Sequence, residues 1–163
     1  FYFSGCFSPG KDETQVAVPF WERRHRLMRM HSCLHLLCAV VEGDVTGGQV
    51  GEAKSRLDFN LPDTRLDKAF IESELNRLIA EDHPAEPRWI SDEDLAAQPD
   101  LVKTMSVKPP SGQGRVRLIR VAECDLQPCG GTHVRSTGEI GPVEVKKVEL
   151  WRRRLDFALV DLL

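Results

Sequence analysis

The stretch PCGGTHVRSTGEIG, residues 128–141, places Cys129 and His133 four positions apart, with two glycines and a threonine between them. This spacing arises either by accident in a glycine-rich turn or because the two side chains form half of a metal site. Zinc is bound in proteins by three or four side chains, so a metal site requires further ligands from elsewhere in the chain. The glycines suit that interpretation, because they let the turn fold tightly enough for both side chains to face inward.

A second pair lies in RMHSCLHLL, residues 29–37, which contains His31 and His35. Apolar residues recur here at three- and four-residue steps, which predicts a helix that begins after Pro19 and ends at Gly43. Side chains four residues apart on a helix project from the same face. Either pair alone is a weak signal, but three imidazoles and one thiolate together suit tetrahedral zinc (Zn²⁺). The predicted zinc ligands are His31, His35, Cys129 and His133.

The composition is that of one ordinary globular domain. The chain has 163 residues, of which 41% are hydrophobic and 29% charged, with a net charge of −3. No apolar run approaches the roughly 20 residues of a membrane span, so no membrane partner is expected. Five cysteines without a regular framework spacing are typical of a reducing compartment, and we therefore expect a cytoplasmic protein.

The remaining pattern predicts an α+β fold, with an antiparallel sheet packed against two main helices. A strand is expected at 54–59, then a helix that begins near Thr64, ends before Pro84 and buries an apolar face. That face consists of Phe70, Ile71, Leu75, Leu78 and Ile79. TGGQ, residues 46–49, is interpreted as a turn after the first helix. Further strands are expected at 87–90, 116–121, 141–150 and 155–160, and a short capped helix at 91–98.

RMHSCLHLL together with DLQPCGGTHVRSTGEIG resembles the freestanding alanyl-tRNA editing proteins of the AlaX family. These are similar to the editing domain of alanyl-tRNA synthetase and, more distantly, to that of threonyl-tRNA synthetase. The likeness extends from about Trp21 to about Glu149 and includes RLDF, LNRLIAEDHP and SVKPPSGQGRVRLIRV. It implies the editing-domain fold, zinc on the four residues above, and hydrolysis of the ester that joins serine, or glycine, to mischarged tRNA(Ala).

Longer family members carry an N-terminal β-rich domain before the histidine helix. Residues 1–20 stand in its place, rich in Phe, Gly, Ser and Pro and without a usable period. We therefore expect residues 1–20 to be a separate N-terminal segment, which could be a remnant of that domain. The zinc-containing editing domain is expected to comprise residues 21–163.

Ester hydrolysis requires a positioned water and a group that stabilises the oxyanion. A closed set of four ligands is typical of a structural site, so His133 is expected to be either a labile ligand or a general base. Backbone N–H groups of Gly130, Gly131 and Thr132 could bind the oxyanion. The side chains expected to contact the amino acid are Thr46, Asp125 and Gln127.

Three basic stretches, at 21–29, 115–120 and 146–154, interrupt a mildly acidic chain and leave room for a phosphate-rich partner. The predicted tRNA-binding residues are Arg23, Arg24, Lys146, Lys147, Arg152, Arg153 and Arg154. Two other interpretations stay open. One is a catalytically inactive RNA-binding module stapled by zinc, and the other is the editing-domain fragment of a larger synthetase.

Overall fold

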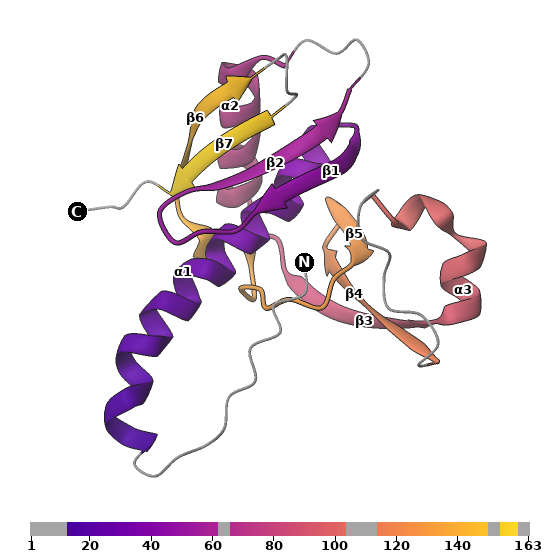
Figure 1. The fold of residues 1–163 in the computed structure, drawn as a ribbon, viewed down its shortest axis with the longest axis horizontal. Helices are drawn as coiled ribbons and strands as arrows, with labels where there is room; N and C mark the ends of the chain where they lie inside the picture. Colours follow the sequence, from indigo (N-terminus) through magenta and orange to yellow (C-terminus); the bar gives the residue numbers. More distant parts are fainter. Residues whose placement is uncertain (1–12, 62–65, 104–113, 150–153, 160–163) are drawn as a thin grey trace.

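The computed structural model describes residues 13–61, 66–103, 114–149 and 154–159, which form three α-helices and two antiparallel sheets (Figure 1). The helices are α1 (Glu13–Val40), α2 (Lys68–Ala80) and α3 (Asp92–Ala97), with 3₁₀ helices η1 (Pro99–Leu101) and η2 (Thr137–Ile140). The strands are β1 (Asp44–Gln49), β2 (Ser55–Asn60), β3 (Ala85–Ser91), β4 (Arg115–Val121), β5 (Asp125–Pro128), β6 (Val143–Glu149) and β7 (Arg154–Leu159). The predicted α+β class is confirmed.

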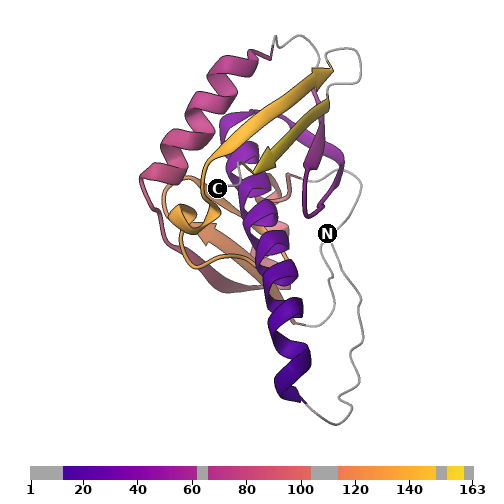
Figure 2. The same cartoon turned by 90° about the vertical axis from the view of Figure 1, so that its left-hand side faces the viewer.

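The strands form two sheets where the sequence predicted one. Four strands pair in the order β1-β2-β7-β6, and three pair in the order β3-β4-β5. One buried cluster draws side chains from α1, α2 and both sheets, including Leu37, Leu75, Phe59 and Ile119. The C-terminal half of α1 therefore packs against both sheets, while its N-terminal half extends beyond them (Figures 1 and 2).

The three-stranded sheet has two distinct faces, because side chains alternate along a strand. Ile119 and Val121 of β4 join the main cluster with α1. Val116 and Leu118 of the same strand instead join Leu95 of α3 in a second cluster. One face of this sheet therefore looks toward α1, and the other is covered by α3.

Several boundaries differ from the expectations. The expected turn at TGGQ is wrong, because these residues lie in β1, which pairs with β2 through an irregular register between Val45 and Gly47. The first helix begins at Glu13, so Pro19 lies within it. A single proline removes one helical N–H donor but does not prevent the turns on either side.

The second helix begins at Lys68, after Asp67, whose carboxylate accepts hydrogen bonds from the N–H groups of Ala69 and Phe70. Thr64, the expected start, lies outside the described residues. Four of the five expected apolar residues are buried, but Phe70 is 59% exposed because it lies beside that face rather than on it. In the described residues, no helix combines the length and the apolar composition needed to cross a bilayer.

A candidate metal centre between the histidine helix and the glycine turn

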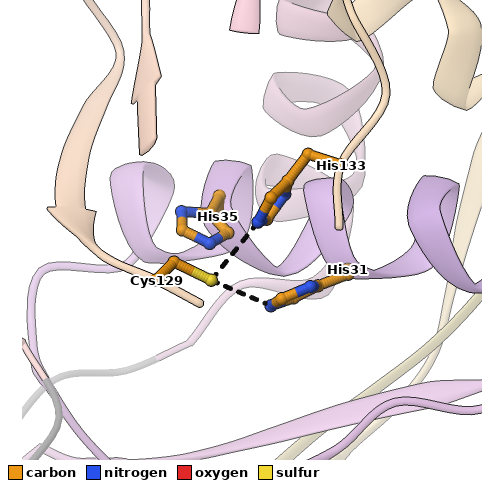
Figure 3. A group of neighbouring side chains, drawn as sticks. All are labelled: His31, His35, Cys129 and His133. Atoms are coloured by element: carbon orange, nitrogen blue, oxygen red, sulfur yellow. Dashed lines mark hydrogen bonds between the residues drawn. The ribbon is translucent and has the colours of Figure 1, made fainter. Parts of the chain in front are cut away.

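The two predicted pairs meet. His31 and His35 lie one turn apart on α1, and the loop after β5 brings Cys129 and His133 onto the same face of that helix (Figure 3). The Cys129 Sγ atom lies 3.5 Å from His31 Nε2 and 3.3 Å from His133 Nε2. One ligand atom from each of the four residues lies within 4.8 Å of all the others. His31, His35 and Cys129 are buried, and His133 is partly exposed.

The spacing of these donors suits zinc. With Zn–S near 2.3 Å and Zn–N near 2.0 Å, a tetrahedral site has sulfur-to-nitrogen edges of about 3.5 Å. The two sulfur-to-nitrogen separations above lie at that value. Three imidazoles and a thiolate also suit zinc better than they suit magnesium or calcium, because those two metals bind mainly oxygen atoms. The four residues therefore fit a zinc ion in their chemistry, and the two sulfur-to-nitrogen separations fit one in geometry.

The protonation state of Cys129 also favours a cation. Burial by itself raises the pKa of its thiol, but hydrogen bonds from His133, His31 and His35 outweigh burial and lower the pKa to about 2. The side chain is therefore a thiolate at neutral pH, which is the form that binds metals. By contrast, burial raises the pKa of Cys38 to about 12. Cys33 and Cys38 are both buried in the core.

His35 is oriented by a buried carboxylate. Its Nδ1–H donates to Asp125 Oδ2 at 2.8 Å, and the Asp125 side chain is completely buried. Lys103 Nζ donates to the other carboxylate oxygen at 2.9 Å, and Gln127 Nε2 donates to Oδ2 at 2.7 Å. This arrangement leaves Nε2 as the free ring nitrogen of His35, as in the carboxylate–histidine–metal triads of zinc proteins.

The negative charges around His35 also favour a cation at its ring. Burial lowers the pKa of His35, but the hydrogen bond to Asp125 and the charge of Cys129 raise it to about 9. For Asp125, burial raises the pKa, while His35 and Lys103 lower it and leave it below its usual value. The negative groups that hold a proton at His35 also favour a metal cation in its place.

Contacts to α1 and β4 hold the turn that carries Cys129 and His133. His133 Nδ1 lies 3.2 Å from Ser32 Oγ, which also accepts the N–H of Val134 at 3.1 Å. Arg117 Nη1 donates to the carbonyl oxygens of Cys129 and Gly131, at 2.8 and 2.7 Å. The glycine turn is therefore fastened both to α1, through Ser32, and to β4, through Arg117.

Gly131 gives His31 its space. A Cβ atom at position 131 would lie 2.2 Å from His31 Cε1 and 2.6 Å from His31 Nδ1. The backbone N–H of Gly131 donates to Cys129 Sγ at 3.4 Å. Any side chain at this position would therefore collide with the His31 ring.

A small cavity of about 30 Å³ lies against the metal centre, between α1, β5 and the β1–β2 pair. Its lining includes His31, His35, Cys129 and Gln127, together with Val45 of β1. Thr46 is exposed and does not line this cavity, although it follows Val45. Asp125 lies beneath His35 with its carboxylate already paired, so the structure gives it a supporting position rather than the expected contact with an amino acid.

The predicted tRNA-binding residues are scattered. Arg23 and Arg24 are exposed on the projecting half of α1, and Lys146 and Lys147 are exposed on β6. Arg152 and Arg153 lie outside the described residues, and only the backbone of Arg154 is described.

Three supporting residues escaped the sequence analysis. Ser32 could have been found, since it lies between the two histidines in the HSCLH motif. Lys103 and Arg117 carry no local signal, because their partners are 22 and 12 or more residues away in the sequence.

An α+β fold that gathers three histidines and a thiolate, three of these four residues being buried beside a small cavity, defines a candidate zinc protein with room for a small ligand. The family model described as "Threonyl and Alanyl tRNA synthetase second additional domain" matches residues 116–151. This match includes Cys129 and His133.

The chain is 34% identical over 149 residues to the alanyl-tRNA editing protein AlaX-M of Methanosarcina acetivorans, covering 86% of this chain and 61% of that protein. It is 31% identical over 145 residues to AlaX-M of Saccharolobus solfataricus, covering 85% and 59%. It is also 34% identical over 142 residues to the alanine–tRNA ligase of Pyrobaculum neutrophilum, covering 79% and 16%. The predicted resemblance to the AlaX editing proteins and to alanyl-tRNA synthetase is confirmed, and the chain spans about three fifths of the editing proteins that it matches.

Proposed function

We propose that this protein hydrolyses the ester of mischarged tRNA(Ala), chiefly seryl-tRNA(Ala), with glycine as a second amino acid removed, and that residues 21–163 form its editing domain. The observation that carries the proposal is the close group of three imidazoles and one thiolate, buried except at His133, beside a small cavity. It occurs in a chain similar to proteins named alanyl-tRNA editing proteins. We further propose that His31, His35, Cys129 and His133 hold one zinc ion.

When bound at such a site, zinc can lower the pKa of a water or polarise the ester carbonyl. His133 is the donor we assign to the labile position, since it alone among the four is partly exposed. Burial, followed by the charges of His35 and His31, lowers the pKa of His133 to about 3, against the opposing pull of Cys129. His133 is therefore neutral at physiological pH, which is the form that can bind the metal or, once it has left the metal, accept a proton from the attacking water.

The oxyanion that forms during ester hydrolysis needs hydrogen-bond donors. The Gly131 N–H already donates to Cys129 Sγ, so we do not assign it this role. Gly130 and Thr132 are exposed on either side of it, and their N–H groups are the donors we propose. Arg117 holds the carbonyl oxygens of Cys129 and Gly131, which keeps these N–H groups in a fixed turn.

Substrate choice follows from the size and polarity of the cavity. Its volume of about 30 Å³ is far below the roughly 300 Å³ at which drug-sized pockets begin, which favours a small amino acid. Serine differs from alanine by one hydroxyl, and a hydrophobic synthetase pocket rejects such an isostere poorly. A pocket that hydrogen-bonds the hydroxyl loses about 1–3 kcal/mol when alanine enters and leaves its polar group unpaired.

We assign the hydroxyl contact to Gln127, which lines the cavity, with Thr46, the exposed residue after the lining residue Val45, as the alternative. The basic surface is assigned to the tRNA phosphates. Its described members are Arg23, Arg24, Lys146 and Lys147.

The test is deacylation of tRNA(Ala) charged with serine, glycine or alanine, by the wild type and by Gln127→Ala and Thr46→Val. The wild type should release serine at least about tenfold faster than alanine. Loss of this preference in one variant, with serine still released, would identify the residue that reads the hydroxyl. Release of alanine as fast as serine would contradict the proofreading role.

A second candidate is an RNA-binding module stapled by zinc, favoured by the fact that all four donors lie close enough to bind one ion together. A zinc-loaded protein that binds tRNA(Ala) but hydrolyses none of the three esters would support this module. Metal analysis of the same preparation is the necessary control.

A further inference from the structure

Trp89 is an exposed aromatic residue on the edge of the three-stranded sheet. It lies on β3, which pairs only with β4 in that sheet (Figure 1). The residue is 61% exposed. Its side chain points to the face of the sheet that looks toward α1. This follows from the alternation along β3, since Ala85 packs against the main cluster and Ile90 against the opposite one.

Trp89 lies in register with the metal centre. It pairs with Arg117 of β4, and the Arg117 carbonyl in turn accepts the N–H of Cys129. Side chains directly opposite one another on neighbouring strands share a face, so Trp89 and Arg117 lie side by side. Two strand spacings of about 4.8 Å place the Trp89 backbone on the order of 10 Å from Cys129.

The same face carries positive charge. Arg115 pairs with Ser91 in the same register and is exposed, and no ion pair links it to the described parts of the chain. Arg117 lies between Arg115 and the main cluster, and its guanidinium donates hydrogen bonds to the carbonyl oxygens of Cys129 and Gly131. The exposed indole, the exposed guanidinium and the metal centre therefore lie on a single sheet face, with Trp89 opposite Arg117 and with Arg115 two residues away along β4.

We propose that Trp89 stacks on the terminal base of the tRNA acceptor end, and that Arg115 contacts a phosphate of that end. This inference rests on the proposed function. The hydrolysed ester is attached to the ribose of the terminal adenosine, so its base must lie about one nucleoside away from the metal centre. Stacking on aromatic side chains is how proteins hold unpaired bases, and arginine is suited to phosphates.

The kinetic test uses Trp89→Ala and Trp89→Phe on seryl-tRNA(Ala). Loss of base stacking should raise KM about five- to a hundredfold in Trp89→Ala, with kcat changed less than about threefold, and Trp89→Phe should retain most of the affinity. Phe70→Ala is the matched control, since Phe70 is 59% exposed but lies on α2, against a different groove. Serine methyl ester has no base, so any hydrolysis of it should be equal in wild type and Trp89→Ala.

The binding test does not depend on activity. In a Trp21→Phe, Trp151→Phe background, Trp89 is the only tryptophan, and adenosine 5′-monophosphate should quench its fluorescence, more weakly after Arg115→Ala. Unchanged KM in Trp89→Ala, or fluorescence that ignores the nucleotide, would overturn the inference. A wild type that deacylates no aminoacyl-tRNA yet shows quenching would instead count against the proposed function alone.

Discussion

Replacing Gly131 with alanine places a methyl group in the space of the His31 ring. The added Cβ would lie 2.2 Å from His31 Cε1, whereas ordinary contacts begin at 3.4 Å. The ring or the turn must therefore shift by about 1.2 Å, the difference between these two distances. Zinc–ligand distances hold to within about 0.2 Å, so His31 cannot remain a ligand after such a shift.

The expected loss in metal affinity is large. Changing a residue that only supports a ligand costs about 10–100-fold in affinity, and displacing the ligand itself should cost at least about 100-fold. Overpacking the site should also destabilise the fold by about 1–3 kcal/mol. Zinc affinity is measured by competition with a chromophoric chelator, and the thermal midpoint of the same samples shows whether the protein remains folded.

Gly130→Ala is the control, because Gly130 is the exposed neighbour in the same turn. It should retain close to one zinc per chain. A Gly131→Ala protein that binds zinc as tightly as the wild type would refute the reasoning, since the close approach between residue 131 and His31 would then have no part in placing the ligand.

Asp125→Asn should weaken zinc binding about 10–100-fold by removing the carboxylate that orients His35, while Glu123→Gln, 89% exposed in the same hairpin, should not. In protein whose metal has been removed with a chelator, iodoacetamide should alkylate Cys129 at a nearly constant rate from about pH 5 to 8, because a thiol with a pKa of about 2 is fully ionised there. The rate is measured by peptide mass spectrometry. A tenfold rise in rate per pH unit would contradict the lowered pKa. Arg24→Glu should weaken tRNA(Ala) binding and reduce its salt slope by about 0.7–0.9 for each phosphate that the variant no longer neutralises, with zinc content unchanged. Arg88→Glu is the control, because the Arg88 side chain lies on the face of β3 opposite to Trp89. Equal losses of tRNA affinity in Arg24→Glu and Arg88→Glu would show that only the net charge of the protein matters.

Much of this architecture could be predicted from local sequence. The apolar period around HSCLH is short-range, and it correctly placed two histidines on one face of a helix. The strand at Ser55–Asn60 and the helix capped by Ser91 were also predicted, because alternation and capping depend on residues a few positions apart. The convergence of two ligand pairs was expected from their chemistry alone.

Residues with distant partners were predicted less well. The glycines of TGGQ were interpreted as a turn, yet β2 supplies the pairing that makes them a strand. Asp125 was expected at the substrate, yet the fold buries its carboxylate between His35 and Lys103. A buried carboxylate must be paired within the protein, so it supports neighbouring side chains instead of contacting a ligand. The sequence around Asp125 does not show whether its carboxylate is buried.

The sequence by itself determined the types of the candidate donor residues, their spacing and the helix that carries two of them, since these depend on side-chain chemistry and on the helical period. Only the tertiary structure decided what surrounds them. Strand register aligned Trp89, Arg117 and Cys129 across one sheet face, and chain packing brought Gly131 against His31. Register and close packing arise from contacts between segments far apart in the chain, where each residue's neighbours are set by the whole fold.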